Sequence, residues 1–225
     1  IGINKKHKNK FKDREDLSSY YKKVKWYNDE NLALSKTDTV IIAIPPFYQK
    51  AKIIECLKHE NINKFVLEKP ISISPEKSRE TINLLMGKKV EVGYNFKYTY
   101  WGTKLLKNFT NQNYKSLDLK WKFKAHHFEN NLNTWKKNEE YGGGVLRFYG
   151  IHLIAFLTEL KFTNVISSEI YFSNNFSYQW KAEFQNFEGV KFKVLVNSKN
   201  LHLKLKVESI TNLQFLLILK ISVFE

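Results

Sequence analysis

The feature that most constrains the fold is the run FVLEKPIS at residues 65–72. Its apolar start predicts a short buried strand. Pro70 must end that strand, because proline fixes φ and has no backbone donor. Glu68 and Lys69 therefore stand at the carboxyl end of a strand, which is where ligands bind in an open α/β sheet. The alternative is a surface ion pair before a turn.

The flanking segments repeat this arrangement. Residues 39–44 form a second apolar run, which two consecutive prolines end. Ser74 and Pro75 are typical of a helix start, with serine as the N-cap and proline at the first helical position. Residues 89–92 then return to the sheet. This alternation of strands and helices predicts a parallel, doubly wound α/β sheet.

The second half of the chain has a different pattern. Residues 117–124 alternate apolar and polar side chains, which predicts a half-buried strand, and residues 191–196 and 201–207 alternate similarly. This predicts an α+β domain with an open, mainly antiparallel sheet and helices on one face. We therefore predict two domains, residues 1–98 and residues 99–225.

Composition excludes several classes of function. The single Cys56 argues against an internal disulfide or a cysteine-rich metal site, and is typical of the reducing cytoplasm. The apolar runs all fall short of the ~20 residues that cross a membrane. The formal net charge is +15, but only three of the 37 basic residues are arginine, and the lysines are spread along the chain. We therefore expect neither a metal, nor a membrane, nor a nucleic acid as partner.

Several short motifs follow one another between residues 40 and 152: Pro45-Pro46, Glu68-Lys69-Pro70, GYNFKY at residues 93–98, Trp135, Gly142-Gly143-Gly144 and Gly150-Ile151-His152. Their order resembles that of the glucose–fructose oxidoreductase and inositol dehydrogenase family (Gfo/Idh/MocA). The resemblance implies a Rossmann-type dinucleotide-binding domain followed by a substrate-binding and oligomerisation domain. It also implies NAD or NADP as cofactor and a sugar or sugar nucleotide as substrate, hence a sugar dehydrogenase or reductase.

The resemblance implies catalytic roles for two side chains. The ammonium of Lys69 can polarise a substrate oxygen and stabilise a developing alkoxide. His152 suits removal of a hydroxyl proton as hydride leaves, because histidine titrates near neutrality. The alternatives are a solvated or ion-paired lysine and a satisfied core histidine.

The resemblance also implies the remaining contacts. The residues expected at the cofactor are Asn4, Ile44, Pro45, Pro46, Gln49, Glu68, Lys69 and Asn95. The residues expected at the substrate are Lys69, Tyr94, Asn95, Lys97, Trp135, Arg147, Tyr149 and His152. Aromatic faces suit stacking on a sugar ring, and an asparagine amide can bond both cofactor and substrate. Arg147 is either an anion ligand or an ordinary surface arginine.

Two departures from the family pattern leave alternatives open. The sequence has no glycine-rich phosphate loop, so either a βα unit of about 30 residues precedes the first strand or residues 1–3 are that strand. Phe148 stands where the family often has aspartate, four residues before His152, and Ala155 replaces a common acid. One interpretation is an active enzyme that uses Lys69 and His152. The other is a catalytically silent binding or assembly subunit.

The C-terminal run at residues 212–224 is apolar on both faces. Such a strand needs a second cover if helices lie on only one side of its sheet. In the family, the open sheet face commonly packs against another subunit. We therefore predict a homodimer, or a dimer of dimers, built around Leu216, Ile218 and Ile221.

Overall fold

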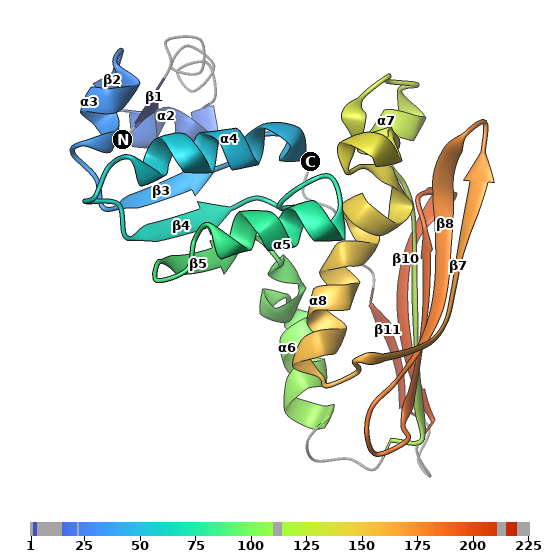
Figure 1. Cartoon of the computed structure of the whole chain (residues 1–225). Helices are drawn as coiled ribbons and strands as arrows, with labels where there is room; N and C mark the ends of the chain where they lie inside the picture. Colours follow the sequence, from blue (N-terminus) through green and yellow to red (C-terminus); the bar gives the residue numbers. More distant parts are fainter. Residues whose placement is uncertain (1, 4–14, 22, 110–113, 211–214, 220–225) are drawn as a thin grey trace.

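The computed structural model describes residues 2–3, 15–21, 23–109, 114–210 and 215–219. Figure 1 shows two parts: short strands with flanking helices, and a long sheet with helices α6 and α8 on one face. The predicted fold class is confirmed, because a parallel sheet of Rossmann type is followed by a mixed, mostly antiparallel one.

The parallel sheet has the order β3-β4-β5, from strands Thr39–Ile42, Lys64–Leu67 and Lys89–Val92. Helices α4 (Pro46–Leu57) and α5 (Pro75–Asn83) connect these strands. The predicted start of α5 is confirmed, since the Ser74 side chain accepts a hydrogen bond from the Lys77 backbone N–H. One face of the sheet packs against α4 and the segment after α5 to form a core. The buried residues of this core are Leu34, Val40, Ile42, Ile53, Cys56, Ile62, Phe65, Leu67, Ile71 and Leu85.

The opposite face of this sheet is more open. Ile41 is 74% exposed, and Val66, its partner on β4, is half-buried. The edge of β3 away from β4 has no strand partner within the described ranges. Strands β1 (Gly2–Ile3) and β2 (Trp26–Tyr27) pair in a separate parallel sheet, together with helices α2 (Glu15–Tyr21) and α3 (Glu30–Leu34). The expectation of a further βα unit stays a prediction.

The second sheet has six strands in the order β11-β10-β6-β9-β8-β7. They are β6 (Ser116–Lys124), β7 (Asn164–Ser173), β8 (Phe176–Gln185), β9 (Lys191–Asn197), β10 (Lys199–Ile210) and β11 (Phe215–Leu219). The pairs are antiparallel except β6–β9, which is parallel. The predicted inner face of β6 is confirmed in part, with Leu117 and Leu119 each 1% exposed.

Helices cover the inner face of this second sheet. They are the 3₁₀ turn η1 (Asn95–Tyr98), α6 (Tyr100–Phe109), the π-helix η4 (Val145–Gly150) and α8 (Ile151–Glu159). Leu153, Phe156 and Leu157 of α8 share one core with Trp180 and Phe192 of the sheet. The turns α7 (His126–Glu129), η2 (Trp135–Lys137) and η3 (Glu139–Tyr141) link β6 to η4. They bring the glycine run to the edge of the first domain.

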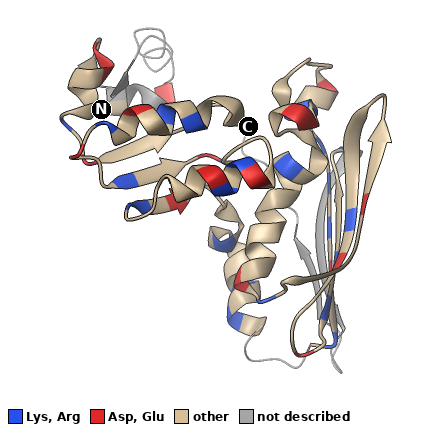
Figure 2. Cartoon of the chain, viewed as in Figure 1, with Lys and Arg blue, Asp and Glu red and all other residues tan. Residues whose placement is uncertain are grey.

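In the view of Figure 2, basic and acidic residues are mixed along helices α4 and α5 of the first domain. Among the described residues there is no group of three His, Cys, Asp or Glu side chains placed to hold a metal ion. None of the described helices has the length and apolar character needed to cross a membrane.

The fully buried Phe65 of β4 should contribute strongly to the stability of the first domain. We expect Phe65→Ala to lower the free energy of unfolding by about 3–5 kcal/mol, because the side chain is fully buried and its loss leaves a cavity. Urea denaturation measures the change. Ile41→Ala, on the exposed face of neighbouring β3, is the matched control and should change stability by less than about 0.5 kcal/mol. Equal losses would show that the two faces are not buried as described.

Candidate active site

Lys69 lies directly after β4, and its side chain reaches the second domain. Its Nζ donates a hydrogen bond to the backbone carbonyl of Phe148 at 2.7 Å and lies 3.6 Å from the centroid of the Phe148 ring. Burial lowers the pKa of Lys69 to about 8; Glu68 opposes this and Lys136 adds to it. The ammonium is therefore held by a neutral carbonyl and a ring face, without a carboxylate bonded to it in the described part of the chain.

His152 lies at the start of α8, one turn after the carbonyl that Lys69 binds. Its ring stacks on Phe96 with centroids 5.0 Å apart and meets Tyr94 edge-on at 6.4 Å. Its Nδ1 is buried without a hydrogen-bond partner among the described residues. Burial, with a smaller contribution from the charge of Lys69, lowers the pKa of His152 to about 3. The imidazole is therefore neutral at neutral pH, and burial makes it a weak base.

The glycine run allows the two domains to approach at this point. A Cβ on Gly143 would lie 2.2 Å from the carbonyl oxygen of Trp135. Gly142 has φ +81°, and a Cβ there would lie 3.0 Å from Cγ of Pro46. Only residues without side chains fit between the turn at Trp135 and the start of α4. The backbone following this turn then forms the π-helix that presents Phe148 to Lys69.

A cleft of about 380 Å³ opens beside His152. It is lined by the end of β5, the η1 turn and α8, and includes four of the expected substrate residues: Tyr94, Asn95, Lys97 and His152. The ammonium of Lys97 is paired with Glu159 at 2.9 Å, a hydrogen bond that raises its pKa. The structure thus brings these four residues together. Ala155 also lines the cleft, so the missing acid leaves an apolar wall there.

Three expected site residues, Gln49, Arg147 and Tyr149, make mainly structural contacts. Gln49 is fully buried, and its Nε2 donates to the carbonyl oxygens of Ile44, Glu68 and Pro70. Its side chain therefore links the segments that follow β3 and β4 by hydrogen bonds. Arg147 is half-buried and donates to the carbonyl oxygen of Ser72 at 2.8 Å, so it links η4 to the loop after Lys69.

Tyr149 points into the core of the second domain. Its ring packs against Trp121 and Phe123, and its hydroxyl lies 3.4 Å from Nδ1 of His127. Burial raises the pKa of this tyrosine. No contact joins it to Lys69 or His152 within the described residues.

The remaining expected residues lie at the carboxyl edge of the parallel sheet, in the η2 turn, or outside the residues that the structure describes. Ile44 and Pro45 are half-buried, Pro46 is buried, and Glu68 and Asn95 are exposed. The ring of Trp135 contacts the Phe148 ring edge-on, with ring centroids 5.4 Å apart. Asn4 lies outside the described residues. The contact made by the Phe148 carbonyl has no signal in the sequence, because any residue type supplies a carbonyl.

Residues 1–96 match the model of an oxidoreductase family with an NAD-binding Rossmann fold, GFO_IDH_MocA. Over this range, the chain is similar to the Gfo/Idh/MocA family. The family predicted from the order of the motifs is therefore confirmed. The sequence matches no curated protein.

Solved structures share the fold at low sequence identity. An NAD-binding protein from Listeria innocua is 20% identical, with a TM-score of 0.66, over 87% of this chain and 60% of that one. D-galactose-1-dehydrogenase from Rhizobium etli is 16% identical, with a TM-score of 0.69, over 83% and 62%. A levoglucosan dehydrogenase in complex with NADH and levoglucosan is 14% identical, with a TM-score of 0.68, over 86% and 57%. The chain thus spans about 60% of the length of these structures.

The electrostatic contact between Lys69 and His152 can be measured directly. In Lys69→Met, we expect the pKa of His152 to rise from its low value, because one of its two causes is removed; burial should still hold it below 6.5. An NMR titration of the imidazole protons between pH 2 and 8 measures the shift. Lys97→Met removes a lysine from the same cleft and is the matched control. A shift in the control but not in Lys69→Met would contradict the described geometry.

Proposed function

We propose that the chain belongs to an NAD(P)-dependent oxidoreductase that transfers hydride to or from a carbon of a sugar or sugar nucleotide. The observation that carries the proposal is the half-buried Lys69 at the carboxyl edge of the sheet, which is bonded to the Phe148 carbonyl and whose charge acts on His152. The family of residues 1–96 supports the cofactor class. The structures of levoglucosan and D-galactose dehydrogenases support the substrate class.

The residues at the sheet edge fit the nicotinamide half of a dinucleotide. The exposed amide of Asn95 can bond a carboxamide, and Pro45 and Glu68 border the same edge. The nicotinamide ring supplies the hydride acceptor or donor when it is bound. Asn4 is proposed near the adenosine ribose, where an amide in place of an acid accommodates either NAD or NADP.

Lys69 is proposed to bind the substrate oxygen. One N–H of its ammonium is used by the Phe148 carbonyl, and two remain to donate. A donor fixed in a site of low polarity stabilises the negative charge that develops on that oxygen. A pKa of about 8 also lets Lys69 exchange its proton near neutral pH.

His152 is proposed as the acid/base. In the oxidation direction, the hydroxyl proton passes to the neutral imidazole as hydride leaves the carbon. In the reduction direction, the same nitrogen returns the proton. Tyr94, Asn95, Lys97, Trp135 and Arg147 are proposed to position the substrate around this pair.

A second candidate function is a catalytically silent subunit that binds the ligands without turnover. Phe148 is the observation that favours it, because a ring stands where an acid would pair with Lys69 and His152. The buried Cys56 supports the proposed cytoplasmic location in either case.

Turnover and its pH dependence test the proposed function. We expect Lys69→Ala to lower kcat by orders of magnitude and His152→Ala to lower it by about 10²–10⁴. The wild-type rate should be constant across neutral pH and fall above about pH 8, where Lys69 loses its charge. Oxidation of a panel of sugars with NAD⁺ and NADP⁺ is followed by absorbance.

Calorimetry with each dinucleotide separates the two candidate functions. Dinucleotide binding without turnover of any sugar would favour the silent subunit. If no dinucleotide binds and no sugar is turned over, the proposal is refuted. Lys77→Ala, which removes an exposed lysine paired with Glu80, is the control and should leave the rate unchanged.

We further propose a homodimer, or a dimer of dimers, built through the second-domain sheet. Leu216, Ile218 and Ile221 lie outside the residues whose side chains are described, so the proposal rests on the apolar sequence there. Light scattering at micromolar concentration should give a multiple of the chain mass. We expect Leu216→Lys with Ile218→Lys to shift the protein toward monomer, because two buried charges oppose association. A wild-type monomer would contradict the proposal.

A further inference from the structure

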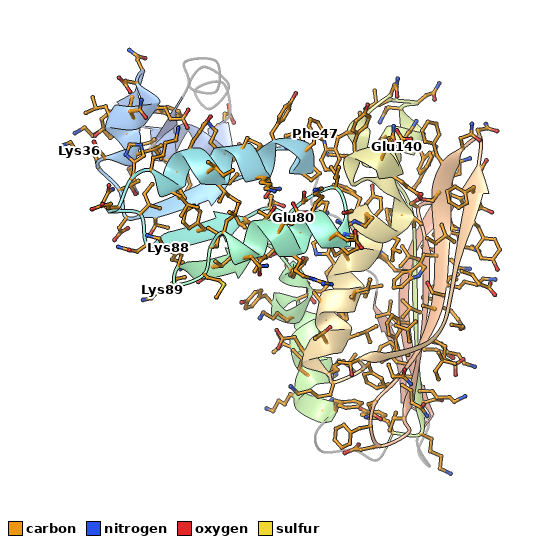
Figure 3. All side chains as sticks on the ribbon, viewed as in Figure 1. Lys36, Phe47, Glu80, Lys88, Lys89 and Glu140 are labelled. Atoms are coloured by element: carbon orange, nitrogen blue, oxygen red, sulfur yellow. The ribbon has the colours of Figure 1, made fainter. Side chains whose placement is uncertain are left out.

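Gln49 is a polar residue on the buried, otherwise apolar side of α4. It lies in the first turn of the helix and shares that side with Ile53 and Cys56, one and two turns further along. Figure 3 shows Phe47, two residues before it, at the end of α4 that is nearest the segment of Glu140. The Gln49 side chain is fully buried. Packing alone would favour an apolar residue at such a position, so the amide must have another role.

The amide of Gln49 donates to three backbone carbonyl oxygens that lie beyond the ends of β3 and β4. Its Nε2 is 3.3 Å from the oxygen of Ile44, 2.9 Å from that of Glu68 and 3.1 Å from that of Pro70. The strands end at Ile42 and Leu67, so the sheet supplies no ladder bonds to these oxygens. Because a buried carbonyl without a donor is costly, one amide placed where three of them converge stabilises this loop.

The orientation of this amide follows from the same contacts. Turning it over would place Oε1 of Gln49 against three carbonyl oxygens, and an amide oxygen cannot donate. In the observed orientation, Oε1 is buried without a hydrogen-bond partner among the described residues. The side chain therefore acts here through its N–H groups alone.

Two of the three carbonyls belong to the residues on either side of Lys69. Gln49 thus holds the backbone of Lys69 from both sides, while Nζ of the lysine binds the carbonyl of Phe148 at 2.7 Å. A lysine has a long, flexible stem, so the position of its backbone decides where the ammonium can reach. The contacts of Gln49 therefore determine the point from which Lys69 extends toward the second domain.

We propose that Gln49 is a positioning residue for Lys69, whose amide fixes the backbone on both sides of the lysine and so directs the ammonium to the substrate oxygen. The inference rests on the proposed function for the role of Lys69. A fully buried side chain is poorly placed to contact a cofactor, so this role differs from the one expected from the sequence. Displacement of a reacting group by about 1 Å can lower a rate about 100-fold, so loss of the amide should affect turnover.

Competitive acetylation, followed by mass spectrometry, tests the inference without relying on turnover. The acetylation of each lysine in the intact chain is measured across alkaline pH, and the midpoint for Lys69 should be about 8. Gln49→Met keeps the length of the side chain but has no donor. In this variant the midpoint should rise by about one pH unit or more toward 10.5, because a displaced ammonium regains water. Glu68, Lys136 and His152, the other ionisable groups that interact with Lys69, are the same in both proteins.

Matched variants separate positioning from packing. Gln49→His keeps a ring N–H at a similar distance from Cα and should hold the Lys69 midpoint close to that of the wild type. Gln49→Asn keeps the amide on a shorter stem, should shift the midpoint by less, and carries the test if Gln49→Met does not fold. Gln185→Met removes a glutamine that donates to the carbonyl of Gly189, in a turn of the second domain, and should leave Lys69 unchanged.

Kinetics on a sugar that the protein turns over provide a second measurement. We expect kcat of Gln49→Met to fall about 100-fold, while the affinity for the dinucleotide, measured by calorimetry, changes less than about twofold. The same variant with His should recover most of the rate. Weaker dinucleotide binding with an unchanged Lys69 midpoint would instead assign Gln49 to the cofactor and overturn the inference.

The inference also fails if the Lys69 midpoint in folded Gln49→Met equals that of the wild type. It fails equally if acetylation of Lys137, which is buried in the second domain, increases along with that of Lys69, because that would show a general loss of structure. A midpoint that shifts for Lys69 alone, in a protein that turns over no sugar, would support the placement by Gln49 and refute the proposed function.

Discussion

The candidate site depends on one hydrogen bond between the domains, from Nζ of Lys69 to the carbonyl of Phe148. The two residues are 79 positions apart in sequence, and the bond joins the end of a parallel strand to a π-helix of the other domain. π-Helical turns are frequent at functional sites. Arg147 makes a second link of the same kind, to the carbonyl of Ser72. Two cations thus bind backbone carbonyls across the interface, and their placement requires both domains to be in contact.

The partner of Lys69 explains its electrostatics. A carboxylate would favour the ammonium and raise the lysine pKa, whereas a carbonyl and the face of a phenyl ring provide only partial negative charge. A cation over an aromatic face contributes about 0.5–2 kcal/mol. Burial therefore has the larger effect, and the pKa is lowered to about 8. Replacement of an acid by Phe148 thus changes Lys69 from a fixed cation into a group that can exchange protons near neutrality.

Local sequence predicted the first domain well, because proline and serine act through their own backbone chemistry. The strands before Pro45 and Pro70, and the Ser74 cap, lie where these residues require them. The pairing of strands that are distant in sequence was harder to predict. Alternation predicted β6 and β9 as half-buried strands, but alternation is the same in both directions, so the parallel β6–β9 pair could not be foreseen.

The candidate site was likewise only partly predictable from local sequence. The glycine run and His152 were identified from short motifs, whereas side-chain direction depends on tertiary packing. Gln49 turns inward to three carbonyls, and Tyr149 turns toward His127. Phe47, Tyr48 and Tyr141 also meet in a cleft at the start of α4. Local sequence could not show this, because Tyr48 and Tyr141 are 93 positions apart.

Burial disfavours the charged forms of both Lys69 and His152, and the charge of the lysine also acts on the histidine. The charge of Lys69 lowers the pKa of His152, so at neutral pH the lysine carries the proton and the histidine does not. In the proposed function, the substrate hydroxyl would meet a donor in Lys69 and an acceptor in His152. Repulsion from Lys69 opposes the protonated state of His152, because two cations in a partly buried site oppose each other. Phe148 cannot supply the carboxylate that would stabilise that imidazolium.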